Sequence, residues 1–61
     1  MKNVLKKWID EKIDFEVKTT GDMRIKSSTI TLIDDDCIVT NSNGSTKAIP
    51  YTSIAEAVFR D

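Results

Sequence analysis

One stretch, residues 29–54, limits this chain to a small β-rich domain. Short apolar runs lie on either side of two turn-forming segments, Asp34–Asp36 and Asn41–Gly44. Asn43-Gly44 is the strongest short hairpin signal, because both residues tolerate the positive φ angles of a type I′ turn. We therefore expect strands that end near Ile33, a strand beginning at Cys37, and a third strand from Ser45 that stops at Pro50, which lacks a backbone N–H.

The residues before this stretch predict a helix followed by two strands. Residues 2–12 carry Val4, Leu5, Trp8 and Ile9 on one helical face, with Asn3 as a candidate N-cap. Because a helix this short is unstable alone, its apolar stripe must pack on the strands or on a partner. We favour packing on the strands.

Two alternating segments follow the helix. Residues 13–19 alternate apolar and charged side chains as a half-buried strand does, and residues 23–26 do so on the return. Gly21, in the turn between them, is expected to take the positive φ. Ser27-Ser28 marks a bulge or a bend, and consecutive Leu32-Ile33 indicates an irregular strand.

The last segments complete a small barrel. Residues 51–53 fit a single tight turn, and residues 54–59 are predicted to form a short closing strand rather than a helix. The predicted fold class is mostly β, with an N-terminal helix over residues 2–12 and a five-stranded small barrel over residues 13–60. One domain covers residues 1–61.

The size of the chain points to self-association. A domain of 61 residues buries a small fraction of its surface and commonly needs a disulfide, a metal or a partner subunit. Cys37 is the one cysteine and histidine is absent, so an internal disulfide is impossible and a zinc site is not expected. A homo-oligomer remains as the route to stability.

Charge and hydropathy restrict the partners and the compartment. The formal net charge is −1, which does not suggest nonspecific nucleic-acid binding by the whole surface, although a local patch can still be basic. No apolar run reaches the length of a membrane span, and the N-terminal segment does not resemble a signal peptide. A cytoplasmic protein without membrane association is expected.

The acidic run Asp34–Asp36 allows three interpretations. It could bind a divalent cation, supply catalytic carboxylates, or form a turn in which Asp side chains accept hydrogen bonds from the backbone. We favour the turn, and Cys37 is expected to be a small buried side chain. With no histidine to act as a base, we expect no enzyme activity, no metal and no cofactor.

The order of these segments resembles the bacterial Sm-like proteins of the Hfq family over about residues 3–59. The resemblance is carried by the N-terminal amphipathic helix, by FEVKTTGD, by Ile30-x-x-x-Asp34, by CIVT in the following strand, and by IPYTSIAEAV at the end. It implies an Sm-like (SH3-like) barrel that closes into a ring, usually of six subunits, through strand edges. The expected edges are residues 37–40 and 54–59.

The resemblance also implies a function, an RNA-binding ring that acts as an RNA chaperone or post-transcriptional regulator. In the family, aromatic, lysine and histidine side chains line a pore that binds uridine-rich RNA. Here an aspartate, Asp35 or Asp36, stands at the aromatic position, and either Tyr51-Thr52 or Thr52-Ser53 replaces the Lys-His pair. Uridine- or adenine-rich RNA is the expected ligand, with Tyr51, Thr52 and Ser53 at the pore and phosphate contacts from Lys2, Lys6, Lys7, Arg24 and Lys26.

A second hypothesis keeps the fold and removes the RNA. An Sm-like or SH3-like barrel can serve as a protein-interaction or assembly module, with the helix and an open strand edge as its contact surfaces. The acidic run and the net charge of −1 favour this alternative.

Overall fold

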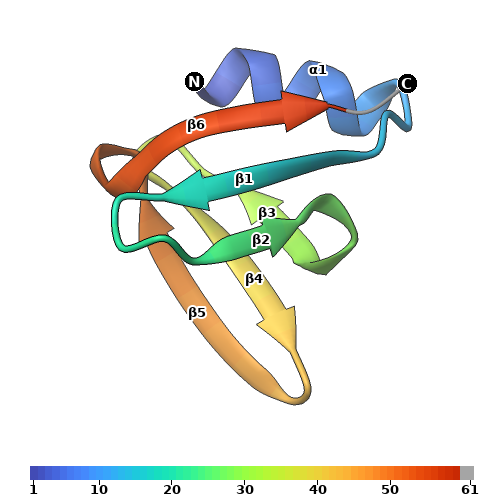
Figure 1. The fold of residues 1–61 in the computed structure, drawn as a ribbon. Helices are drawn as coiled ribbons and strands as arrows, with labels where there is room; N and C mark the ends of the chain where they lie inside the picture. The colour runs from blue at the N-terminus through green and yellow to red at the C-terminus, as the bar shows by residue number, and fades with distance from the viewer. Residues whose placement is uncertain (60–61) are drawn as a thin grey trace.

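A computed structural model describes residues 1–59 as a mostly β fold with an N-terminal helix (Figure 1). The helix α1 spans Lys2–Asp10. The strands are β1 (Phe15–Thr19), β2 (Arg24–Lys26), β3 (Ile30–Ile33), β4 (Cys37–Ser42), β5 (Ser45–Pro50) and β6 (Ile54–Phe59). Two single 3₁₀ turns, η1 (Ser27–Thr29) and η2 (Tyr51–Ser53), lie before β3 and before β6.

The strands form two antiparallel sheets of three strands each, in the orders β2-β1-β6 and β3-β4-β5. The predicted mostly β class with its N-terminal helix is confirmed. The strand count differs, because η1 divides the expected five-stranded arrangement into six strands. Within residues 1–59 no strand pairing joins the two sheets, so they do not form one closed barrel. The predicted barrel end at residue 60 lies outside the described residues.

The helix begins at Lys2 as predicted and ends two residues earlier, at Asp10. Met1 is the N-cap residue and makes no side-chain cap hydrogen bond, so the prediction of Asn3 as the cap was wrong. At the other end, Lys12 takes a positive φ of 58° and the Ile13 N–H donates to the Trp8 carbonyl at 2.8 Å. This tight C-terminal turn ends the helix and directs the chain into β1.

The β1–β2 turn is held by a side chain. Thr19 is buried, and its Oγ1 accepts a hydrogen bond from the Met23 N–H at 3.1 Å. The positive φ falls on Asp22, at 62°, and not on Gly21 as predicted. Aspartate tolerates this conformation better than most residues, so the turn does not need the glycine there.

The hairpin of β4 and β5 is the most regular part of the fold. Its register runs from Cys37 opposite Pro50 to Ser42 opposite Ser45, which leaves Asn43-Gly44 as a two-residue turn with φ angles of 54° and 79°. These angles match the predicted type I′ turn. Strand β4 lies in the middle of its sheet, so the prediction that residues 37–40 form an edge was wrong.

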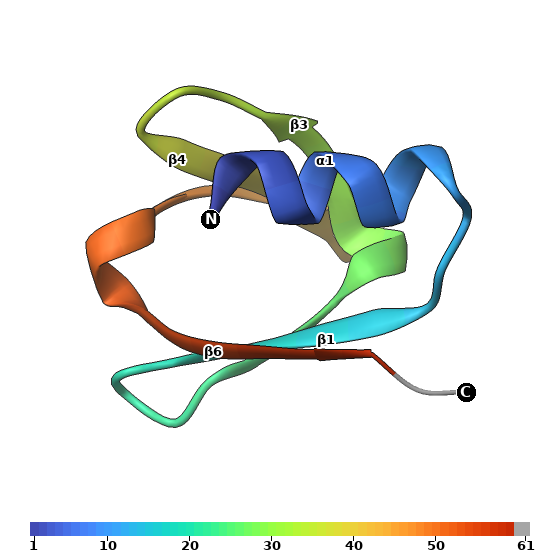
Figure 2. The same ribbon diagram turned by 90° about the horizontal axis from the view of Figure 1, so that it is seen from above.

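Six buried apolar side chains form the core between the sheets, and they come from five elements. The helix supplies Leu5, and the strands supply the others: Phe15, Val17, Ile25, Ile38 and Ile49. Figure 2 looks down on α1, which lies over one end of the space between the two sheets. Trp8 packs against the core and stacks at a tilt on both Phe15 and Phe59, each at 5.3 Å between ring centroids.

Only part of the apolar face of α1 is buried. Leu5 is fully buried and Trp8 is half-buried, whereas Val4 and Ile9 remain exposed. Core packing is confirmed for Leu5 and Trp8. Among residues 1–59, no helix has the length and apolar character needed to cross a bilayer.

Because Leu5 carries the contact of α1 with the core, Leu5→Ala should destabilise the protein by about 2–5 kcal/mol. Val4→Ala is the matched control, since Val4 is 46% exposed on the same helix and should change stability by less than about 0.5 kcal/mol. Urea unfolding followed by circular dichroism measures both. Equal effects of the two substitutions would show that the helix is not docked through Leu5.

Candidate nucleic-acid interface

The predicted pore residues Tyr51, Thr52 and Ser53 form η2, the turn that connects β5 of one sheet to β6 of the other. The Tyr51 N–H donates to the Asp36 carbonyl at 3.1 Å, and the Tyr51 hydroxyl donates to the Asp34 carbonyl at 2.5 Å. The Ser53 carbonyl accepts from the Thr20 N–H at 2.8 Å. The side chain of Tyr51 is half-buried against the core, so its ring serves the fold and only its outer part is accessible.

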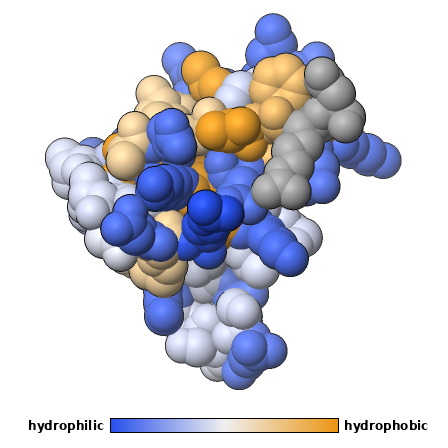
Figure 3. All heavy atoms as spheres, viewed as in Figure 1, coloured by the Kyte–Doolittle hydropathy of each residue, from blue (hydrophilic) through white to orange (hydrophobic). Residues whose placement is uncertain are grey.

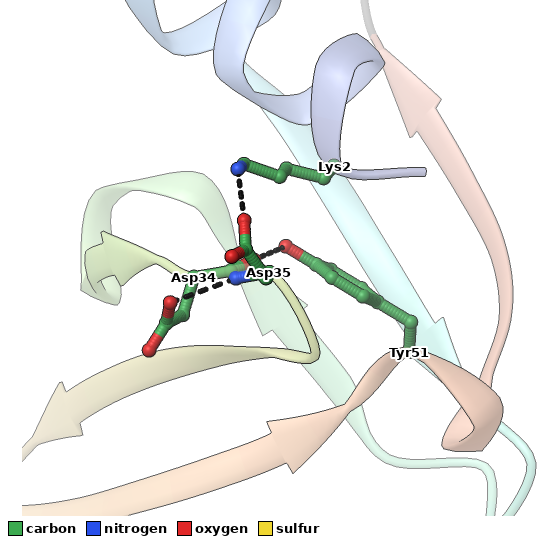
Figure 4. A network of polar contacts seen from close by, with 4 residues as sticks. All are labelled: Lys2, Asp34, Asp35 and Tyr51. Atoms are coloured by element: carbon green, nitrogen blue, oxygen red, sulfur yellow. Dashed lines mark hydrogen bonds and ion pairs between the residues drawn. The ribbon is translucent and has the colours of Figure 1, made fainter.

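Lys2 lies beside this turn, paired with an acid. Its Nζ donates to Asp35 Oδ1, and Asp34 Oδ1 accepts from the Asp35 N–H at 2.8 Å, as Figure 4 shows. The Asp34–Asp36 segment is therefore a turn stabilised by its own side chain, the interpretation favoured from sequence. Among residues 1–59, no three acidic, cysteine or histidine side chains are grouped so that they could hold a metal ion.

The contacts around Tyr51 shift the pKa values of three side chains. The hydrogen bond from Lys2, with the charge of its ammonium group, holds the pKa of Asp35 below its usual value. The same hydrogen bond raises the pKa of Lys2, and burial raises the pKa of the Tyr51 hydroxyl. The positive charge of Lys2 is thus paired with Asp35, and the adjacent acids repel a phosphate, so this end of the molecule is a poor place for a polyanion.

The other predicted lysines are spread along the helix. Lys7 is exposed on α1. Lys6 lies at a shallow apolar hollow of about 320 Å³ between α1 and β3, beside Ile9 and Leu32. Neither residue is grouped with the Tyr51 turn. The structure therefore divides the predicted contacts instead of gathering them into one site.

The remaining two predicted phosphate contacts, Arg24 and Lys26, lie at a groove between β2 and the β4–β5 hairpin. The groove has a volume of about 590 Å³, within the range of ligand sites. A third cation, Lys47 of β5, lines it from the opposite side. The other lining residues are small polar or apolar ones: Met23, Ile25, Thr29, Thr40, Ser42, Asn43, Ser45 and Ile49.

The charged residues that line the groove are all cations. Its lining includes three cations, and none of the described residues that line it is acidic. Arg24 Nε lies 3.6 Å from Glu16 Oε1, a long contact that leaves the Arg24 side chain 69% exposed. Such a surface contact is worth little in free energy and leaves the donors of Arg24 available to an anion.

The lengths of the strands explain why the groove exists. Strand β2 has three residues, whereas β4 and β5 have six each, so the hairpin extends beyond the sheet that faces it. The inner face of the hairpin then changes from core to solvent along its length, from buried Ile49 to exposed Lys47. Figure 3 shows this projecting lower end of the molecule as hydrophilic, with apolar side chains gathered at the opposite end.

Sequence reasoning missed Lys47, although a signal was present. Lys47 is two residues before Ile49 and therefore shares the inward face of the strand. It pairs with Thr40, which is buried. A lysine at an inward position near a hairpin turn indicates a place where the core has ended and a polar groove begins.

No aromatic side chain lines the groove in the part of the chain that the structure describes. Trp8, Phe15 and Phe59 cluster at the α1 end, and Tyr51 belongs to η2. A nucleic acid in the groove would therefore be held by its phosphates and sugars, since stacking on bases needs a ring.

No protein-family model, curated protein or solved structure matches this chain.

The Lys2–Asp35 pair gives a testable titration. Lys2→Met removes the hydrogen bond that lowers the pKa of Asp35, so the Asp35 pKa should rise toward its ordinary value of 3.8, as NMR titration of the carboxyl carbon would record. Lys6→Met is the control and should leave Asp35 unchanged.

The lowered pKa of Asp35 determines how the contribution of the Lys2–Asp35 pair to stability changes with pH. The pair stabilises the folded state fully above the unfolded-state pKa of Asp35, and this contribution is lost as the pH falls through the lower folded-state value. The wild type and the Lys2→Met variant should therefore converge in stability in strong acid. A gap that widens on acidification would contradict the assignment.

Proposed function

We propose that this chain is a single-stranded RNA-binding domain of the Sm-like type that works as a homo-oligomer. The observation that carries the RNA proposal is the groove between β2 and the β4–β5 hairpin, whose lining includes Arg24, Lys26 and Lys47 and no acidic residue among those described. The protein has a formal net charge of −1, so binding depends on this local concentration of cations rather than on the whole surface.

The arrangement of the strands supports the Sm-like part of the proposal. Strands β2 and β3 are separated only by η1, so together they behave as one strongly bent strand that belongs to both sheets. Counted this way, the molecule has five strands and a 3₁₀ turn before the last one. This is the order expected of a small Sm-like or SH3-like barrel, opened on the side of the groove.

Assembly is supported by the edge strands β5 and β6. Strands β5 and β6 each lie at the edge of a sheet and have one partner within residues 1–59. Near the end of β6, Val58 and Phe59 are 51% and 47% exposed. Pairing of β5 in one copy with β6 in the next would satisfy both edges and cover part of this apolar surface, and repetition would close a ring, with six subunits proposed.

The proposed binding mode relies on phosphate contacts rather than on a uridine-specific pore. The Tyr51–Ser53 turn is the part of the expected interface that the geometry supports least, because its aromatic ring is half-buried and its surroundings are acidic. Cations without aromatic rings favour contacts to the phosphate backbone. We expect uridine-rich and adenine-rich oligonucleotides to bind with similar affinity.

The alternative function, a protein-interaction module without RNA, is favoured by the same open edges. An extended segment of another protein could add to β5 or β6 through main-chain hydrogen bonds. Under this alternative the cations of the groove are solvated surface residues with no polyanion to bind.

A titration of labelled RNA at low and increasing salt tests the RNA proposal. Lys47→Ala should lower the affinity for uridine-rich and adenine-rich oligonucleotides alike. It should also reduce the magnitude of the slope of log affinity against log salt concentration by about 1. Lys7→Ala, on the exposed side of α1, is the matched control and should change neither quantity. Absence of RNA binding by the assembled protein at low salt would leave the interaction module as the function.

Hydrogen exchange at two protein concentrations tests the assembly. Amides of β5 and β6 that face outward should become more protected at the higher concentration, because a neighbouring copy pairs with them. Amides of β4 are the internal control, since β4 already has a partner on each side. Native mass spectrometry under the same conditions should show a discrete species of several subunits, and a monomer with concentration-independent exchange would refute the ring.

A further inference from the structure

The turn at the tip of the β4–β5 hairpin combines two features of chemical importance. Asn43 is followed directly by Gly44, and Asn43 also lines the cationic groove. We propose that Asn43 is a site of spontaneous deamidation, and that the carboxylate so formed regulates the groove. The regulatory half of this proposal rests on the proposed RNA function, whereas the chemical half does not.

The local structure leaves the reacting groups accessible. Both turn residues are exposed, and the amide of Asn43 makes no hydrogen bond within residues 1–59. Nothing lies within 4 Å of where a Cβ on Gly44 would sit. Deamidation requires the backbone nitrogen of the following residue to approach the asparagine side chain, and a glycine in open space obstructs this approach least.

The reaction needs only water. The Gly44 backbone nitrogen, having lost its proton, attacks Cγ of Asn43; a C–N bond forms, the bond from Cγ to the side-chain nitrogen breaks, and ammonia leaves. Water then opens the five-membered succinimide at either carbonyl, giving aspartate or isoaspartate. The sum is the hydrolysis of one amide to a carboxylate and ammonium, without oxidation or reduction.

The product would change the groove in two ways. One negative charge appears among Arg24, Lys26 and Lys47, where it attracts these cations and repels a phosphate. In isoaspartate the main chain also runs through the former side chain, which lengthens the backbone of a two-residue turn whose φ angles are 54° and 79°. The neighbouring pair Ser42 and Ser45 would then lose its register.

Asn41 provides an internal comparison, because it lies only two residues away. It belongs to β4, opposite Thr46, and its Nδ2 donates to Thr46 Oγ1 at 3.4 Å. The next residue is Ser42, whose side chain hinders attack by its nitrogen. Pairing in the ladder and this hydrogen bond restrain Asn41, so it should react far more slowly than Asn43.

The first experiment measures the chemistry alone. The folded protein is incubated at mildly alkaline pH, and isotope-resolved mass spectrometry of its peptides follows each asparagine. The conversion should occur at Asn43 well ahead of Asn41, and Asn43→Gln should abolish it, because glutamine would need a less favourable six-membered ring. Reaction of Asn43 no faster than Asn41 would overturn the proposal.

The second experiment measures the consequence with two folded variants that differ in charge. Asn43→Asp carries the product charge and Asn43→Gln does not, and circular dichroism confirms that both fold. Asn43→Asp should bind RNA about 2- to 5-fold more weakly at low salt, with the difference shrinking as salt is added. Equal affinities would overturn the regulatory role. If the wild type also fails to bind RNA, the proposed function fails with it, while the deamidation result stands.

Discussion

The fold depends on one small core in which the helix and both sheets meet. Leu5, Val17 and Ile38 are fully buried there, one from α1 and one from each sheet. Each of the three layers supplies side chains that are buried in this core. The helix is therefore structural, and its exposed residues Val4 and Ile9 are what remains of its stripe for outside contacts. A core this small gives a marginal monomer, which is the physical argument for assembly.

The groove is a consequence of how that core ends. Strand β2 is too short to cover the whole inner face of the β4–β5 hairpin, so the face that begins with Ile49 finishes with Lys47 in solvent. Three cations then line a groove from opposite sides.

Local signals in the sequence identified most of the elements. The alternation in β1, the Asn43-Gly44 turn and the tight turn at Tyr51–Ser53 each depend on neighbouring residues, and all three agree with the structure. The interior position of β4 was not predictable from its composition, because a short apolar strand suits an edge or a centre equally well. The groove was missed for a related reason, since β2 and β5 are brought together by the fold rather than by sequence.

The molecule thus has two chemically different ends, and this division limits what each can bind. The aromatic cluster of Trp8, Phe15 and Phe59 lies with α1 and the exposed apolar end of β6, where contact with another copy would exclude water. The hairpin end has polar and cationic side chains with no aromatic ring lining its groove. Under the proposed function, a ligand there would be selected by its negative charge, because bases would find no stacking partner. Affinity set by so few charges is sensitive to a single added carboxylate, which is why the chemistry of Asn43 matters to the groove.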